Sequence, residues 1–209
     1  MRELMKLTSS TIIEYINLMR GRGLASLAFF YCDFRDDDKK SLRGLLSSLL
    51  LQLCYWSDSY STILSDFYSE HDYGSRRPSE NAVIGCLKSI LECPGQAPIF
   101  IIIDALDECS NTSGVPSSRE KVLLFVKELV HLHLPTLHIC ITSRLEVEIT
   151  TFLRPLAFHQ VSLHDEVGQK QDIVDFIKSV VDTDPTMKTW RVKDKELVKE
   201  VLTKKSGGM

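Results

Sequence analysis

Apolar residues recur at helical or strand spacing along most of the chain. Between residues 10 and 20, Ile12, Ile16 and Met19 recur at three- and four-residue steps, which predicts a helix that ends at Gly21. The same spacing predicts further helices over residues 41–53, 59–70, 79–91, 120–132, 146–153, 165–181 and 193–202. Short apolar runs or alternation predict strands over residues 24–34, 98–103, 137–142 and 158–163.

The order of these elements indicates an α/β fold. Strands that alternate with long helices form a mainly parallel sheet with helices packed against it. Residues 98–103 have no polar alternation, which is typical of a strand covered on both faces. Ligands of such sheets bind beyond the carboxyl ends of the strands, so the residues at those ends are the candidates for function.

Composition narrows the classes of protein that remain. The 209 residues include 25 Lys and Arg against 28 Asp and Glu, a net charge of −3, which argues against a nucleic-acid-binding protein. No apolar run approaches the 18 residues of a membrane span, so no membrane partner is expected. Six cysteines without a Cys-x-x-Cys pair predict a reduced chain with a cytoplasmic location.

The apolar segment Phe100 to Ile103 leads directly into three carboxylates, Asp104, Asp107 and Glu108. A carboxylate at the tip of a strand can hold Mg²⁺, a hard cation that prefers oxygen ligands and binds alongside substrate phosphates. A second carboxylate three or four residues later can orient an attacking water. The alternative is a strand that ends in a solvated polar turn. The density of carboxylates favours the magnesium and phosphate site.

The next strand also ends in polar side chains. Residues 137–141 are followed by Thr142, Ser143 and Arg144, and the arginine side chain offers a planar fork of donors suited to phosphate oxygens. By itself Arg144 could equally pair with a surface carboxylate. Because the acidic strand end lies one helix earlier, we expect the two ends to meet at one site.

These residues resemble the NACHT class of signalling P-loop NTPases, in the nephrocystin-like form common in large fungal proteins. Asp104-Ala105-Leu106-Asp107-Glu108 is similar to the Walker B pattern of that class, and Thr142-Ser143-Arg144 to its sensor strand. The resemblance extends from about residue 8 to about residue 209. It implies a three-layer P-loop NTPase-like fold in the STAND class, which uses ATP or GTP with Mg²⁺ to switch between a closed monomer and an assembled signalling form.

The resemblance also implies roles for single residues. Asp104 would act on Mg²⁺, Asp107 and Glu108 would position water, and Arg144 would sense the γ-phosphate with Thr142 and Ser143 beside it. Nucleotide is the implied ligand, and homo-oligomers or downstream repeat domains of a longer protein are the implied partners.

One part of the family pattern is missing. The phosphate loop Gly-x-x-x-x-Gly-Lys-Ser/Thr should precede the first helix, but no glycine precedes Gly21, and Lys6 does not fit the motif. The expected organisation is therefore an atypical leader over residues 1–9, a partial NTPase core over 10–165 and the start of a helical region over 166–209. Loss of the first strand should also leave an exposed sheet edge.

Three functions remain open. The first is a nucleotide-dependent switch domain that lacks its phosphate loop and is therefore an inactive NTPase as this chain. The second is a non-catalytic interaction or oligomerisation module, or a remnant without a function of its own. The third is an acid/base hydrolase that uses Asp104 and Glu108, which the absence of a Gly-x-Ser-x-Gly nucleophile pattern disfavours.

Overall fold

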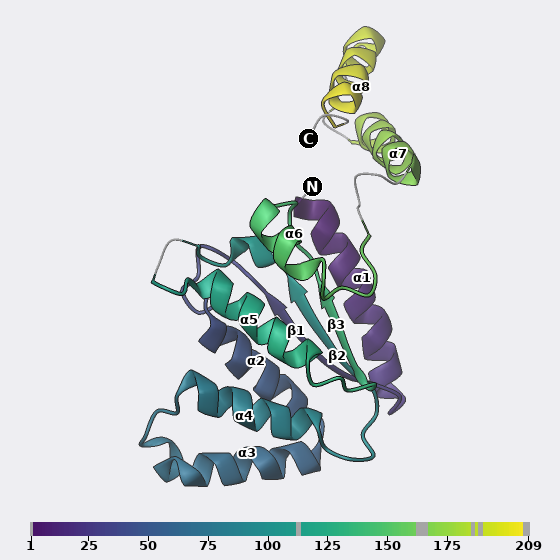
Figure 1. Cartoon of the computed structure of the whole chain (residues 1–209). Helices are drawn as coiled ribbons and strands as arrows, with labels where there is room; N and C mark the ends of the chain where they lie inside the picture. Colours follow the sequence, from purple (N-terminus) through teal and green to yellow (C-terminus); the bar gives the residue numbers. More distant parts are fainter. Residues whose placement is uncertain (1, 112–113, 162–166, 185–186, 188–189, 207–209) are drawn as a thin grey trace. The chain divides into compact units, whose positions relative to one another are not determined.

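The computed structural model of the chain describes residues 2–111, 114–161, 167–184, 187 and 190–206 (Figure 1). Among these, the side chains of residues 2–8, 167–173 and 204–206 lie outside the description. The described residues fall into two compact units, one ending at Ala157 and the other beginning at Phe158. The domain boundary expected at residues 165 and 166 lies outside the described residues and stays a prediction.

The unit that ends at Ala157 is built around a parallel sheet. Within the described residues, β1 (Ser26–Tyr31), β2 (Ile99–Asp104) and β3 (Leu137–Ile141) pair in that order. Tyr31 is the register partner of Asp104, and Ile103 that of Ile141, so the three strands end at the same edge of the sheet. The remaining elements of this unit are α1 (Arg2–Gly21), α2 (Leu42–Tyr55), α3 (Asp58–Glu70), α4 (Glu80–Leu91), α5 (Ser118–Val130), α6 (Val147–Leu153) and the 3₁₀ helices η1 (Asp72–Gly74) and η2 (Leu106–Glu108).

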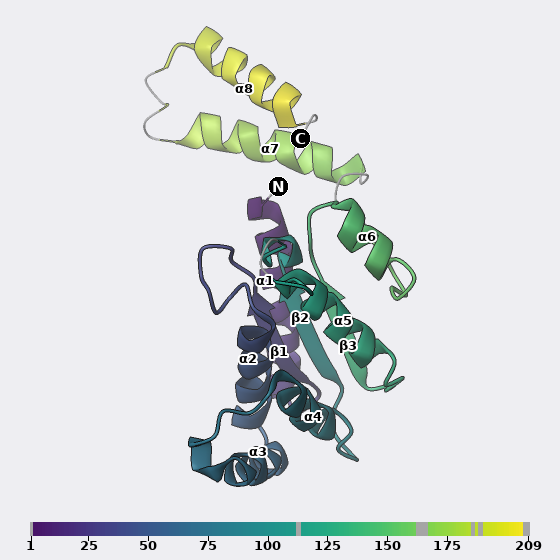
Figure 2. The ribbon, with the colours of Figure 1, turned by 60° about the vertical axis from the view of Figure 1, so that its left-hand side comes forward.

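Helices cover both faces of the sheet (Figures 1 and 2). The odd-numbered isoleucines of β2, such as Ile101, pack with buried residues of α2, α4 and α5. Ile102 points to the opposite face and packs against Ile13 and Ile16 of α1. This alternation explains why β2 has no polar residue before Asp104, because each of its faces is buried. The expected α/β fold with a parallel sheet flanked by helices is confirmed.

Two segments differ from the sequence-based expectation. The first helix begins at Arg2 rather than near Ser10. The segment Arg2 to Leu7 consists of strong helix formers, so the helix extends beyond the part with clear apolar spacing. The strand expected over residues 158–163 is wrong for 158–161, which form no strand, while 162 and 163 lie outside the described residues. Phe158 is 94% exposed, so it has no buried face of a sheet on which to pack.

The two edges of the sheet differ. Along β1, the Gln52 side chain of α2 takes the place of a neighbouring strand: its Oε1 accepts from Phe29 N–H at 3.0 Å and its Nε2 donates to Phe29 C=O at 2.7 Å. Along the outer edge of β3, no further strand pairs within the described residues. The sheet is therefore blunted at one edge and open to strand pairing at the other.

The loop between β1 and α2 folds back on the first turn of α2. The Ser41 hydroxyl donates to Asp38 C=O and accepts from Gly44 N–H, each at 3.1 Å. A Cβ on Gly44 would lie 1.9 Å from the Asp38 carbonyl oxygen, so this position requires glycine. The close approach fixes the loop that carries Lys39.

The second unit contains α7 (Val167–Thr183) and α8 (Val192–Ser206). Lys199 of α8 forms an ion pair with Asp182 of α7 at 2.9 Å. Among the described residues, no helix is both long and apolar enough to cross a membrane.

Candidate functional site

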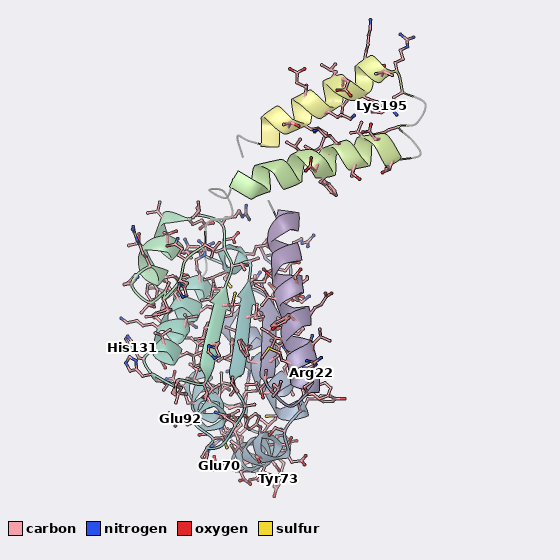
Figure 3. All side chains as sticks on the ribbon, turned by 90° about the vertical axis from the view of Figure 1, so that its right-hand side faces the viewer. Arg22, Glu70, Tyr73, Glu92, His131 and Lys195 are labelled. Carbon is pink, nitrogen blue, oxygen red and sulfur yellow. The ribbon has the colours of Figure 1, made fainter. Side chains whose placement is uncertain are left out.

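Asp104, the last residue of β2, lies at the centre of the carboxyl edge of the sheet. Its side chain is almost fully buried, and two hydroxyl groups donate to the same oxygen, Oδ1: those of Ser9 in α1 and of Thr142 after β3, the latter at 2.6 Å. Arg22 and Glu92 lie at the opposite end of the sheet, where the strands begin (Figure 3). Asp104 therefore joins elements from three parts of the chain at one end of the sheet.

Thr142 connects the ends of β2 and β3. Its Oγ1 donates to Asp104 and accepts from Ala105 N–H at 3.0 Å, while its backbone C=O accepts from Leu106 N–H at 2.9 Å. Its backbone N–H donates to Ile103 C=O at 3.0 Å, which extends the hydrogen-bond ladder between β2 and β3 by one residue. One residue thus satisfies the side chain of Asp104 and two backbone donors of the turn after it.

Ala105 has a left-handed backbone conformation, with φ of 55° and ψ of 48°. This conformation reverses the chain directly after β2 and starts η2. It is unfavourable for every residue with a Cβ, and most of all for β-branched residues. A small residue at this position is therefore a requirement of the turn itself.

Asp107 and Arg144 form an ion pair that ties η2 to the loop after β3. Asp107 Oδ1 accepts from Arg144 N–H at 2.9 Å, and Oδ2 accepts from Arg144 Nε at 2.6 Å. The carboxylate is 2% exposed, whereas the arginine side chain is 59% exposed. The contact raises the pKa of Arg144, since Asp107 stabilises its charged form. The two predicted site residues are thus brought together, with both oxygens of Asp107 directed at Arg144.

Arg119 supports the same turn from α5. This buried arginine donates to the backbone C=O of Asp107 and forms an ion pair with Glu146, and it lies 3.7 Å from Glu148. A guanidinium group buried among a carbonyl and two carboxylates holds η2 and the start of α6 in one arrangement. Arg119 is therefore a structural support of the Asp107 and Arg144 pair.

A pocket of about 270 Å³ opens beside Asp104. It is lined by Ser10, Tyr31, Cys32, Asp33, Lys39, Asp104, Ala105 and Glu108. Three carboxylates and one ammonium group give it a formal charge of −2, so it attracts cations and repels a phosphate that arrives without one. Of the predicted site residues, Asp104 and Glu108 line this pocket, while Asp107 is turned to Arg144.

Two cysteines lie next to the pocket. Cys32, directly after β1, and Cys109, directly after η2, place their sulfur atoms 3.4 Å apart. The hydrogen bond between the two thiols, burial and the carboxylate of Asp104 raise the pKa of Cys32, whereas the same hydrogen bond and the charge of Arg119 lower the pKa of Cys109.

The residues of the pocket suit Mg²⁺ only where a bound phosphate supplies further ligands to the ion. Within the described residues, no group of three or more His, Cys, Asp or Glu side chains is arranged to hold a metal ion. Mg²⁺ is commonly bound by one or two carboxylates together with waters and substrate phosphates, so Asp104 and Glu108 suit a magnesium ion that arrives with a phosphate ligand.

The structure also places predicted and unpredicted residues together. Thr142 contacts Asp104, and the half-buried Ser143 follows it in the loop to Arg144. Three residues of the site were not predicted from the sequence: Ser9, Arg119 and Lys39, the last of which lines the pocket. Ser9 lies within α1, one residue before the helix expected from the sequence, so no pattern singled out its hydroxyl. Lys39 lies in a stretch of charged residues, 33–40, in which no motif distinguishes it from its neighbours.

A comparison with protein families gives a match to the greater part of the chain. Residues 7–144, more than half of the chain, match the family model described as Nephrocystin 3, N-terminal. No curated protein and no solved structure matches the chain. The matched range begins within α1, includes all three strands and ends at Arg144. The chain therefore belongs to the nephrocystin 3 N-terminal family.

Proposed function

We propose that the chain is a nucleotide-binding switch domain of the NACHT type that binds a nucleoside triphosphate, ATP or GTP, together with Mg²⁺ at the carboxyl edge of the sheet. One observation carries the proposal: Asp104 is buried at the tip of β2, is hydrogen-bonded to the end of β3, and lines a pocket with a second carboxylate, Glu108. Ligands of parallel α/β sheets bind at this edge.

The residues of the pocket have different roles in this proposal. Asp104 and Glu108 supply hard oxygen ligands, and Lys39 supplies a positive charge to a phosphate oxygen. Bound Mg²⁺ would neutralise phosphate charge. The hydroxyl groups of Ser9 and Thr142 donate to Asp104 Oδ1 and so fix the orientation of its carboxyl group.

Asp107 has a positioning role in this proposal. Both of its oxygens are engaged by Arg144, so it orients the arginine rather than a water molecule. Arg144 is mostly exposed, and its remaining guanidinium donors can reach a γ-phosphate from the loop after β3. A phosphate that draws Arg144 away from Asp107 would couple ligand binding to the position of η2.

The test is nucleotide binding to the full chain, measured by calorimetry with and without Mg²⁺. We expect micromolar binding that EDTA abolishes, because the negative pocket requires the cation. Asp104→Asn should weaken this binding at least about tenfold, since even indirect disturbance of a metal site costs 10–100-fold. Asp66→Asn makes the same chemical change on the exposed face of α3 and should leave binding unchanged.

The second candidate function is a non-catalytic interaction or oligomerisation module. The open edge of β3 favours it, because a strand from a second copy of the chain can pair there. A folded chain that binds no nucleotide with Mg²⁺ and forms a concentration-dependent dimer by sedimentation would replace the first proposal with this one.

A further inference from the structure

The sulfur atoms of Cys32 and Cys109 meet although the residues lie far apart in the sequence. Cys32 follows β1, Cys109 follows η2, and the sulfur atoms are 3.4 Å apart. Both side chains are nearly fully buried, at 5% and 2% exposed. The pair therefore bridges the end of an edge strand and the turn that leaves the central strand.

The distance is close to bonding range. A disulfide has a sulfur–sulfur length of about 2.05 Å, so the two atoms must approach by about 1.4 Å. Both residues lie outside the regular strands, in segments whose side chains can shift without breaking a ladder. The backbone at Cys32 is already tied to the central strand, since its N–H donates to Asp104 C=O at 3.0 Å. All six cysteines are free thiols, and no other pair of them is hydrogen-bonded within the described residues.

We propose that Cys32 and Cys109 form a redox-sensitive pair, which peroxide converts to a disulfide that locks the turn after β2 to the end of β1. Oxidant reaches the pair through the pocket of about 270 Å³, which Cys32 lines. The sulfur of Cys109 is 3.4 Å from that of Cys32, within reach of the attack that closes the disulfide.

The chemistry balances with hydrogen peroxide as the oxidant. One sulfur of the pair attacks a peroxide oxygen, the O–O bond breaks, and the proton of that thiol leaves with the departing oxygen as water. The other sulfur then attacks the sulfenic sulfur, the S–O bond breaks, and its proton leaves with the oxygen as a second water. Two thiols lose two electrons to peroxide, and one S–S bond forms.

The disulfide would act on the geometry of the turn. Ala105 and Glu108 lie between β2 and Cys109, so fixing Cys109 to β1 restricts the segment that supplies one wall of the pocket. An effect of oxidation on nucleotide affinity rests on the proposed function. Formation of the disulfide does not, because it needs only the two thiols and the oxidant.

The experiment treats the reduced full-length chain with a few equivalents of hydrogen peroxide, blocks the remaining thiols with an alkylating agent, and maps the peptides without reduction. We expect one linked peptide pair that contains Cys32 and Cys109, with a mass two hydrogen atoms below the sum of the two reduced peptides, and its loss on adding dithiothreitol. A cross-link between distant positions restricts the unfolded chain, so the midpoint of thermal unfolding should rise by roughly 5–15 °C.

Controls separate this pair from general oxidation. Cys32→Ala and Cys109→Ala should each abolish the linked peptide and the rise in midpoint. Cys86→Ala removes another buried thiol, on α4, and should preserve both. Links among other cysteines, or peroxide consumption with no link in the folded wild-type chain, would overturn the proposal. Because no nucleotide or metal is used, a failure of the proposed function leaves this result unaffected, and the reverse also holds.

Discussion

The backbone of Ala105 explains at the scale of single residues why the turn after β2 takes a small side chain. Its φ of 55° is left-handed, a conformation that costs an L-residue about 1–2 kcal/mol relative to its favoured regions. Two hydrogen bonds hold the conformation: its N–H donates to Thr142 Oγ1, and its C=O accepts from Glu108 N–H at 2.8 Å. The strain is thus located between the two carboxylates of the pocket, Asp104 and Glu108.

We predict that Ala105→Gly stabilises the folded chain. Relief of the left-handed strain exceeds the entropy that glycine loses, so the free energy of unfolding should rise by up to about 1 kcal/mol, measured by urea denaturation. Ala105→Val should lower it by more than about 1 kcal/mol, because a branched Cβ fits this conformation worst. Ala82→Gly, within α4, provides the matched control and should lower stability by about 1 kcal/mol. Equal losses at both positions would contradict the assignment.

Some residues of the site could be predicted from the sequence, and others could not. Asp104 and Thr142 directly follow apolar segments, so their positions at the strand ends follow from the fold class. Arg119 lies in an amphipathic stretch and reads as a solvent-facing residue, because a buried arginine is recognisable only from partners in other elements. The contact of Cys32 with Cys109 depends on the order of the strands, which spacing along the chain does not encode.

At the scale of elements, the edge of β1 depends on a single side chain. Gln52 satisfies both the N–H and the C=O of Phe29, and its Nε2 also donates to Ser48 Oγ at 2.9 Å. A side-chain amide has the same donor and acceptor as a peptide group, so α2 supplies the equivalent of one residue of an additional strand.

We predict that Gln52→Leu both destabilises the chain and exposes the edge of β1. Two backbone groups would lose their partners, which should lower the free energy of unfolding by about 1–3 kcal/mol. The freed edge should also increase concentration-dependent association, measured by light scattering. Ser47→Ala changes an exposed position of the same helix and should alter neither property. A Gln52→Leu chain with unchanged stability would show that the amide contributes no net free energy.

The elements themselves were largely predictable because periodicity reports burial. The helix expected over residues 41–53 is α2, and the hydroxyl of Ser41 caps it by accepting from Gly44 N–H. The first helix was longer than its apolar pattern because propensity extends a helix beyond the part that packs. The strand expected over residues 158–163 failed for 158–161 because alternation alone does not supply a strand to pair with.

At the scale of the whole molecule, the two described clusters of buried apolar side chains that pack on the sheet lie entirely in the first unit. The clusters of buried apolar side chains on the two faces of the sheet extend from Ile13 to Ile149 and include no residue after Ala157. The fold class was therefore predictable from residues before that point. The division at Ala157 was not, because the segment that follows has the same apolar periodicity as the helices of the core.

We predict that a chain ending at Ala157 folds cooperatively. Both clusters are retained, so its thermal midpoint should lie within a few degrees of the full chain by differential scanning calorimetry. Ending the chain at Leu134 removes β3 and leaves the backbone groups of β2 that pair with β3 without partners. This shorter fragment should therefore not fold. Aggregation or non-cooperative unfolding of the longer fragment would show that residues after 157 complete the core.

The contact between Gly44 and Asp38 has a consequence for how sequences of this kind can diverge. Any single-nucleotide change that replaces Gly44 introduces a Cβ 1.9 Å from a carbonyl oxygen, so substitution there must be preceded by a rearrangement of the loop from Asp33 to Lys40. In relatives of this chain, the glycine should therefore mark which sequences keep the loop against α2, and its replacement should coincide with an altered loop length.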